Sequence, residues 1–158
     1  MNKQTLKTYA FWIFITEAVG ALAGWLTRAD VQQYTAEVLQ PDWAPPNIVF
    51  PIVWTILYAL MGIGAARIDL SPASADRTRS LRIYFVQLAV NFFWSLIFFH
   101  WQAYGFALAW LCLLWVLILA MILSFRKVDK LAAWLQLPYL LWVSFAGVLN
   151  WAVWTLNR

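Results

Sequence analysis

Residues 41–58 read P-D-W-A-P-P-N-I-V-F-P-I-V-W-T-I-L-Y, and this stretch decides the fold. Four prolines and two tryptophans stand at the entrance of a run that carries no charge from Trp43 to Ala66, which is long enough to cross a bilayer. Prolines are tolerated before a helix and in its first turn, because the amide hydrogen that they lack has no helical partner there. The stretch therefore predicts a rigid turn that leads into a membrane helix.

An aromatic stripe follows on that helix. Phe50, Trp54 and Tyr58 recur at every fourth residue, so a helix places them on one face. Aromatic side chains also gather at membrane interfaces. The stripe by itself fits either an interfacial anchor or the wall of a binding site.

The composition defines the class of protein. Of the 158 residues 64% are hydrophobic, and the mean hydropathy is +0.70. This is more apolar surface than a soluble domain of this length can bury, so we expect an integral membrane protein. The formal net charge is +4, but the basic residues lie in short clusters between apolar runs. Nucleic acid is therefore not a predicted partner.

Metal and cofactor chemistry finds little support in the sequence. Cys112 and His100 are the single cysteine and the single histidine, which excludes an intramolecular disulfide and a cluster of such ligands. His100 remains open to a role as one axial ligand, although a histidine at a helix end usually lies at the membrane interface. We predict no metal site and no required cofactor.

Residues 1–158 are predicted to form one membrane domain. Charged residues separate its apolar runs, and these runs predict five transmembrane helices. The uncharged run 83–125 is about twice as long as a bilayer core requires, so it is predicted to form a hairpin that turns between His100 and Gly105. Long continuous apolar runs favour an all-α bundle over a barrel. The predicted helices are residues 9–27, 46–66, 81–101, 105–125 and 131–155, with a flexible polar connector at 67–81.

The basic residues predict an orientation. Five spans place nine of the eleven on the side of the N-terminus, and only Arg28 and Arg158 on the other side. In an inner or plasma membrane, this predicts a cytoplasmic N-terminus and an external C-terminus. The loop 28–45 is too long for a simple helix connection, so it is interpreted as the cap of a cavity, with a solvated loop as the alternative.

Polar residues within the spans usually face the protein interior. Asn91 and Ser95 share a face of the third helix, and Asn150 continues a stripe with Trp142 and Ala146 on the fifth. Such residues either line a cavity or bond neighbouring helices to one another. Glu17 on the first helix fits two interpretations, a protonated carboxyl bonded to a neighbour or a proton-linked site.

The twelve tryptophans indicate a ligand. Trp54, Trp94, Trp115 and Trp142 fall well inside their spans, where interfacial anchoring does not require them. An internal aromatic lining suits a flat, conjugated, apolar ligand, whereas an ion path would require rings of charge or carbonyls. The G-x-x-x-G pair Gly20 and Gly24 permits close helix approach, either within the bundle or in a dimer.

Three motifs occur together and in order: P-D-W-A-P-P with F-P-I-V-W-T-I-L-Y at 41–58, N-F-F-W-S-L-I-F-F at 91–99, and L-P-Y-L-L-W-V-S-F-A-G-V-L-N at 137–150. With these motifs the chain resembles the TspO/MBR family. These are the tryptophan-rich sensory proteins related to the mitochondrial translocator protein, also called the peripheral-type benzodiazepine receptor. The resemblance covers nearly the whole chain.

The resemblance implies a five-helix bundle, commonly a homodimer, with a pocket beneath the first loop. It implies binding of porphyrins, such as protoporphyrin IX or haem, and of synthetic isoquinoline or benzodiazepine-type ligands. The ligand-binding residues that it implies are Pro45, Phe50, Trp54, Tyr58, Asn91, Trp94, Trp142 and Ala146.

Some family members promote light-dependent breakdown of protoporphyrin, which the resemblance would assign to Trp142 and a loop tyrosine. Tyr34 is the candidate for that tyrosine, and it lies seven residues before Pro41, where the family usually has six. The sterol-recognition pattern of animal members is not matched, because Trp151 and Thr155 replace its tyrosine and its basic residue. Cholesterol is therefore not a predicted ligand.

Three functions remain open from the sequence. The leading hypothesis is a membrane receptor or carrier of tetrapyrroles, which acts in sensing, transport or homeostasis. The second is an enzyme that degrades porphyrin photo-oxidatively. The third is a scaffold or lipid-exchange protein whose cavity is incidental.

Overall fold

Eight helical segments make up the computed structural model, which describes residues 1–158. They are α1 (Lys3–Leu26), α2 (Arg28–Glu37), α3 (Val49–Asp69), α4 (Ala75–Ser95), the π-helical turn η1 (Leu96–His100), α5 (Tyr104–Val128), α6 (Lys130–Trp134) and α7 (Leu137–Leu156). Five stretches are long and apolar enough to cross a membrane, and these are Lys3–Leu26, Val49–Asp69, Ala75–His100, Tyr104–Val128 and Lys130–Leu156. The predicted all-α membrane bundle of five spans is confirmed.

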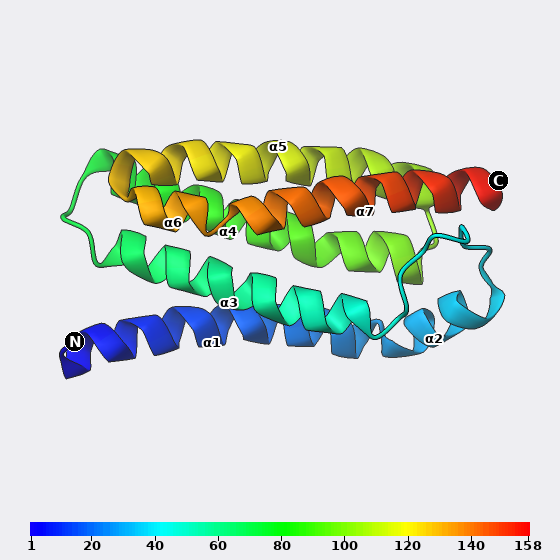
Figure 1. Ribbon diagram of the computed structural model, residues 1–158, viewed down its shortest axis with the longest axis horizontal. Coiled ribbons are helices and arrows are strands. Elements are labelled where there is room, and N and C mark those ends of the chain that lie inside the picture. The colour runs from blue at the N-terminus through cyan, green and yellow to red at the C-terminus, as the bar shows by residue number, and fades with distance from the viewer.

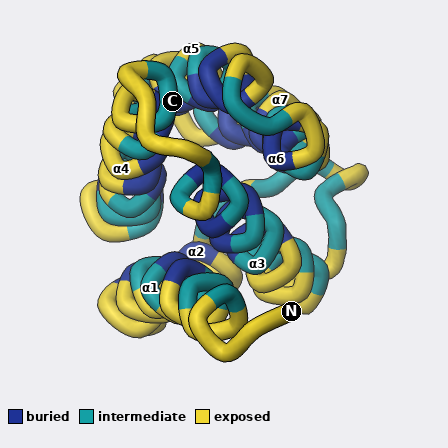
Figure 2. The backbone as a smooth tube through the Cα atoms, turned by 90° about the vertical axis from the view of Figure 1, so that its left-hand side faces the viewer, coloured by how far each residue is buried: buried dark blue, intermediate teal, exposed yellow.

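The spans lie side by side along the long axis of the molecule (Figure 1). The N-terminus lies at one end of the bundle, and α2 and the C-terminus lie at the other, as an odd number of crossings requires. Helix α1 packs mainly on α3, whereas α5 packs against both α4 and α7. Buried residues lie toward the middle of the bundle, and exposed residues lie on its outer side (Figure 2).

The side chains follow the same division. Met61, Tyr84, Phe125 and Tyr139 come from four different helices and are almost fully buried. Large apolar side chains also point outward along every span, and Phe14 and Leu141 are both more than two thirds exposed. In water such an outer surface would favour aggregation, whereas in a bilayer it contacts lipid tails.

Helix α4 begins earlier than predicted, at Ala75 rather than at residue 81. The hydroxyl oxygen of Ser74 accepts a hydrogen bond from the Arg77 amide at 3.1 Å and caps the helix. The Arg77 guanidinium also pairs with Asp69 at the end of α3, at 2.7 Å. The predicted flexible connector 67–81 is therefore mostly helix, because hydropathy marks the apolar part of a helix and misses its polar turns.

The last span is broken, although it was predicted as one helix over 131–155. Helix α6 ends at Trp134 and α7 begins at Leu137, with Pro138 in its first turn. Pro138 has no amide hydrogen to continue the helical ladder. The side chain of Gln136 is fully buried at the break and donates to the Leu60 carbonyl at 3.1 Å. This bond fastens the break to α3.

The hairpin turn lies within the predicted range His100 to Gly105. Residues 101–103 connect η1 to α5, and Gln102 has a positive φ of 51°. The π-helical turn before it was not predicted. No proline or glycine marks it in the sequence.

Polar contacts close the end of the bundle near the N-terminus. The Trp12 indole N–H donates to Asp69 at 3.0 Å, and the Arg67 guanidinium donates to Asp129 at 2.8 Å. Burial raises the pKa of Asp129, but the Ala132 amide and Arg67 outweigh it and hold the pKa below its ordinary value. This contact therefore stabilises the fold at neutral pH, and its contribution is lost as the pH falls through the lowered pKa.

The crossing of α1 and α3 depends on a glycine, which gives a first prediction. A Cβ atom at Gly62 would lie 2.6 Å from the Ile13 Cα atom, so Gly62→Ala forces the two backbones apart. We expect a loss of about 1–3 kcal/mol of stability, measured by thermal unfolding in detergent. Gly147→Ala is the control, because its Cβ would meet its nearest atom at 3.8 Å. Equal melting temperatures for the two variants would contradict the prediction.

Candidate functional site

A cavity of about 580 Å³ opens at the end of the bundle where α2 lies. Helices α1, α2, α3, α4 and α7 line it, together with η1 and Asn47. This volume is typical of small-molecule sites. The aromatic members of the lining are Tyr34, Phe50, Trp54, Tyr58, Trp94, Phe98, Phe99 and Trp142.

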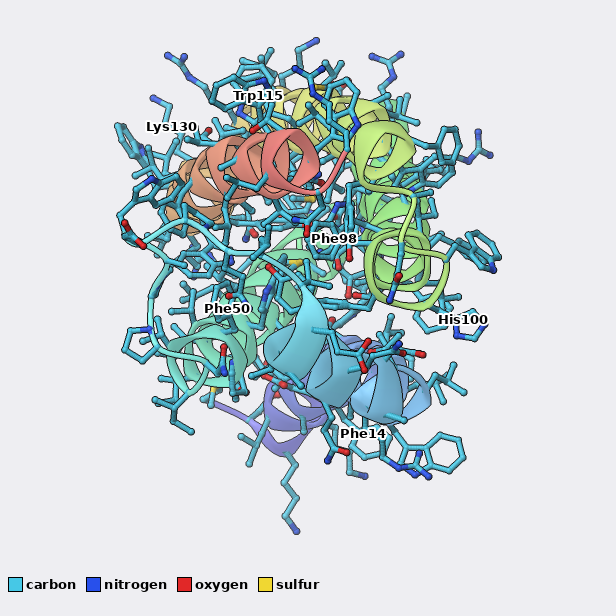
Figure 3. The ribbon with its side chains drawn as sticks, turned by 90° about the vertical axis from the view of Figure 1, so that its right-hand side faces the viewer. Phe14, Phe50, Phe98, His100, Trp115 and Lys130 are labelled. Atoms are coloured by element: carbon cyan, nitrogen blue, oxygen red, sulfur yellow. The ribbon has the colours of Figure 1, made fainter.

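The structure brings most of the predicted ligand-binding residues together. Seven of them line this one cavity, namely Phe50, Trp54, Tyr58, Asn91, Trp94, Trp142 and Ala146. The aromatic stripe of α3 therefore faces inward. Seen from the α2 end, Phe50 and Phe98 lie inside the bundle, whereas Phe14 and Trp115 lie at its periphery (Figure 3).

Two predicted positions do not contribute to the wall. Pro45 lies in the segment before α3, and its near neighbour Asn47 lines the cavity instead. Trp115 was predicted to line the interior, but it borders a separate groove of about 490 Å³ between α5 and α7. Its indole N–H donates to the Ser144 hydroxyl at 2.9 Å. Depth within a span does not reveal the direction in which a side chain points, and for this reason the prediction for Trp115 was wrong.

A buried chain of hydrogen bonds lies at the cavity wall. The Tyr58 hydroxyl donates to the Asn91 Oδ1 atom at 3.0 Å, and the Asn91 Nδ2 atom donates to the Tyr139 hydroxyl at 2.6 Å. Tyr139 in turn donates to the Gln87 Oε1 atom at 2.8 Å. These bonds fix the orientation of the Asn91 amide, which keeps one N–H and one lone pair for a ligand.

Sequence reasoning missed Gln87 and Tyr139. Gln87 lies four residues before Asn91 on the same helical face, and it is fully buried. That spacing was a usable signal. Tyr139 follows Pro138 and carries no such pattern, so only the hydrogen bonds from α7 to α4 in the folded structure reveal its contacts.

Asn150 has a structural role. Its Nδ2 atom donates to the Tyr104 carbonyl at 2.9 Å, and its Oδ1 atom accepts from the Trp94 indole at 3.2 Å. Asn150 thereby bonds α7 to α5 and holds Trp94 at the cavity wall. For Asn150 the interpretation of a bond between helices is confirmed. Asn150 also lines the cavity, as Ser95 does.

The glycine pair of α1 lies against the cavity. A Cβ atom at Gly20 would collide with the ring of Tyr58, whereas one at Gly24 would meet nothing within 4 Å. Gly20 therefore permits a close contact inside the bundle. Gly24 leaves the cavity open along α1.

Residues 28–45 differ in form from the predicted loop, because α2 occupies most of them. Helix α2 contributes Tyr34 to the lining, and the Tyr34 ring packs edge-on against Phe99 at 5.3 Å. Asp30 contacts His100 at 3.1 Å, and both backbone groups of Leu39 bond the Asn157 side chain. These contacts hold a polar helix that hydropathy does not detect.

The Tyr34 hydroxyl is protonated at neutral pH. Its side chain is buried, and burial, followed by the influence of Tyr104, raises the pKa of Tyr34 to about 12. Any chemistry of Tyr34 at neutral pH therefore starts from the protonated form.

Glu17 also lines the cavity. It is half-buried, and no protein group lies within hydrogen-bond or ion-pair distance of its carboxyl. The interpretation of a carboxyl bonded to a neighbour is therefore wrong. His100 contacts a carboxylate at the surface and lies outside the cavity lining.

Fold and cavity together define a class, namely five-span α-helical membrane proteins with an aromatic intramembrane cavity. The model of the TspO/MBR family matches residues 12–155. The chain is 37% identical over 158 residues to the tryptophan-rich protein TspO of Chlorobaculum tepidum, and the match covers 99% of each chain. It is 34% identical over 151 residues to the tryptophan-rich sensory protein of Cereibacter sphaeroides, with 94% and 92% covered. It is also 34% identical over 141 residues to the translocator protein of Bos taurus, with 88% and 83% covered. The chain belongs to the TspO/MBR family.

The hydrogen-bond chain gives a second prediction. Tyr139→Phe removes one hydroxyl and leaves both the Asn91 N–H and the Gln87 carbonyl without their partner. We expect a loss of about 1–3 kcal/mol of stability, measured by thermal unfolding. Tyr104→Phe is a matched control, because the Tyr104 hydroxyl is buried without any partner. Its melting temperature should not fall, and a fall equal to that of Tyr139→Phe would contradict this account.

Proposed function

We propose that the cavity binds planar tetrapyrroles, protoporphyrin IX or haem, and that the protein is a membrane receptor or carrier for them in sensing, transport or homeostasis. The observation that carries the proposal is the convergence of Trp54, Trp94 and Trp142 from three helices on one cavity. Indole faces and edges suit a flat conjugated ring. Synthetic isoquinoline and benzodiazepine-type ligands share this shape and belong to the same proposal.

The polar groups of the wall support the same ligand class. Asn91 presents a fixed amide, and the Trp142 indole N–H is buried without an acceptor in the protein. A ligand that forms a hydrogen bond with either group would offset the cost of leaving that group buried without a partner. Arg28 adds a positive charge to the lining, which suits the propionate groups of a porphyrin.

Titration of the purified protein with protoporphyrin tests this proposal by quenching of tryptophan fluorescence. Trp54→Ala and Asn91→Ala should each weaken binding by at least about tenfold, because each removes a direct contact. Trp115→Ala is the control, since that indole lies outside the cavity. Unchanged affinity in both cavity variants would place the ligand elsewhere. Absence of saturable binding would favour the scaffold or lipid-exchange function.

A second candidate function is the light-dependent breakdown of bound porphyrin. The observation that favours it is that Trp142 and Tyr34 line the same cavity, so both an indole and a phenol face one ligand. An indole is easier to oxidise than a phenyl ring. Loss of the Trp142 indole should therefore stop the reaction without preventing binding.

Illumination of the protoporphyrin complex distinguishes the two functions. If the protein is an enzyme, Trp142→Phe should slow bleaching of the bound pigment at least about tenfold, while the binding affinity changes less. Trp115→Phe should bleach at the wild-type rate because its indole is remote from the cavity. Equal bleaching in the wild type and Trp142→Phe would support a receptor or carrier.

We also propose the orientation and the assembly. The clustering of basic residues at the end opposite α2 supports a cytoplasmic N-terminus and an external cavity mouth. Enzymatic reporters fused to each terminus test this orientation, and an active cytoplasmic reporter at the C-terminus would contradict it.

A homodimer is proposed from the family resemblance alone. Cross-linking in native membranes tests the dimer, and a monomer at all concentrations would contradict it.

A further inference from the structure

Glu17 is an acid for which neither the fold nor the proposed porphyrin ligand provides a partner. Three acidic residues near the ends of helices, by contrast, have partners: Asp69 pairs with Arg77, Asp129 with Arg67, and Asp30 with His100. Glu17 instead lies within the α1 span, nine residues before the helix ends at Leu26. At about 1.5 Å per residue this is about 14 Å from the end that carries α2. Its carboxyl therefore faces the inner part of the cavity.

The cavity contains few charges. Among its lining residues only Glu17 and Arg28 are formally charged. No ion pair joins the Arg28 guanidinium to Glu17; Arg28 lies over the Trp25 ring at 4.6 Å and donates to the Trp25 carbonyl at 2.7 Å. A carboxylate at membrane depth without a partner is costly. A cationic ligand would remove that cost.

The surroundings of Glu17 suit a flat cation. One turn further along α1, Gly20 lies against the Tyr58 ring, and Trp54 stacks on Tyr58 with centroids 5.5 Å apart. Aromatic faces attract cations when water is excluded. Gly24 leaves open space on the same side of α1, so a ligand has room between Glu17 and the mouth.

We propose that Glu17, with Trp54 and Tyr58, forms a subsite for a planar aromatic cation in the inner part of this cavity. The inference rests on the proposed function, because it requires that the cavity binds ligands at all. It adds a selectivity that a porphyrin does not explain, since the acidic groups of a porphyrin suit Arg28 and not Glu17. The chain should therefore prefer a cationic ring over a neutral ring of the same shape.

A matched pair of dyes tests the subsite. We would titrate the protein in non-ionic detergent at about pH 9 with 10-methylacridinium, which is permanently charged, and with 9-methylacridine, whose ring nitrogen is unprotonated at that pH, and follow ligand fluorescence. The wild type should bind the cation at least about tenfold more tightly than the neutral ring. Glu17→Gln should reduce that ratio to near one, chiefly by weakening binding of the cation. Glu37→Gln should keep the wild-type ratio, because Glu37 is an exposed acid outside the cavity.

Protoporphyrin titration of the same samples distinguishes failure of the cation subsite from failure of the proposed function. Saturable protoporphyrin binding without any preference for 10-methylacridinium would overturn the subsite and leave the proposed function intact. A preference that persists in Glu17→Gln would also overturn it. Failure of the wild type to bind protoporphyrin and both dyes would overturn the proposed function. If Glu17→Gln does not fold, Glu17→Asp replaces it and should retain only part of the preference, about threefold.

Discussion

Inside a bilayer no water is present to satisfy polar groups, and this constraint governs the whole structure. Each span satisfies its backbone internally, so the polar side chains that remain must find one another across helices. The bonds from Tyr58 through Asn91 and Tyr139 to Gln87 do this for α3, α4 and α7. Because these bonds fix where the three helices meet, they also fix the polar part of the cavity wall.

The two ends of the bundle are built differently. Near the N-terminus, Asp69 and Asp129 join the helix ends through hydrogen bonds and ion pairs, and α1 lies directly on α3 at Gly62. At the other end, aromatic side chains from several helices line the cavity, and α2 forms part of its wall. The closed end provides rigidity, and the open end provides the volume that the proposed tetrapyrrole ligand and the proposed cation subsite both require.

The number of spans could be predicted from hydropathy, because crossing a bilayer sets a minimum length for each apolar run. The places where prediction failed are polar or irregular. Helix α2 is a polar segment held by Tyr34 packing and by two contacts at its ends, and the break before α7 depends on Pro138 and on the burial of Gln136. Each depends on a distant residue, which a local pattern does not contain.

For the site, the sequence by itself determined which residue types were present and which shared a helical face, because the period of a helix fixes that. It thus identified Phe50, Trp54 and Tyr58 as one stripe and Asn91 and Trp142 as candidates within their spans, and the family resemblance implied that these residues contact a ligand. Only the tertiary structure decided how each helix is rotated about its axis. That rotation turns Trp54 inward and Trp115 outward, and it leaves Glu17 facing the cavity without a partner, since rotation is set by contacts between helices and not by spacing along one of them.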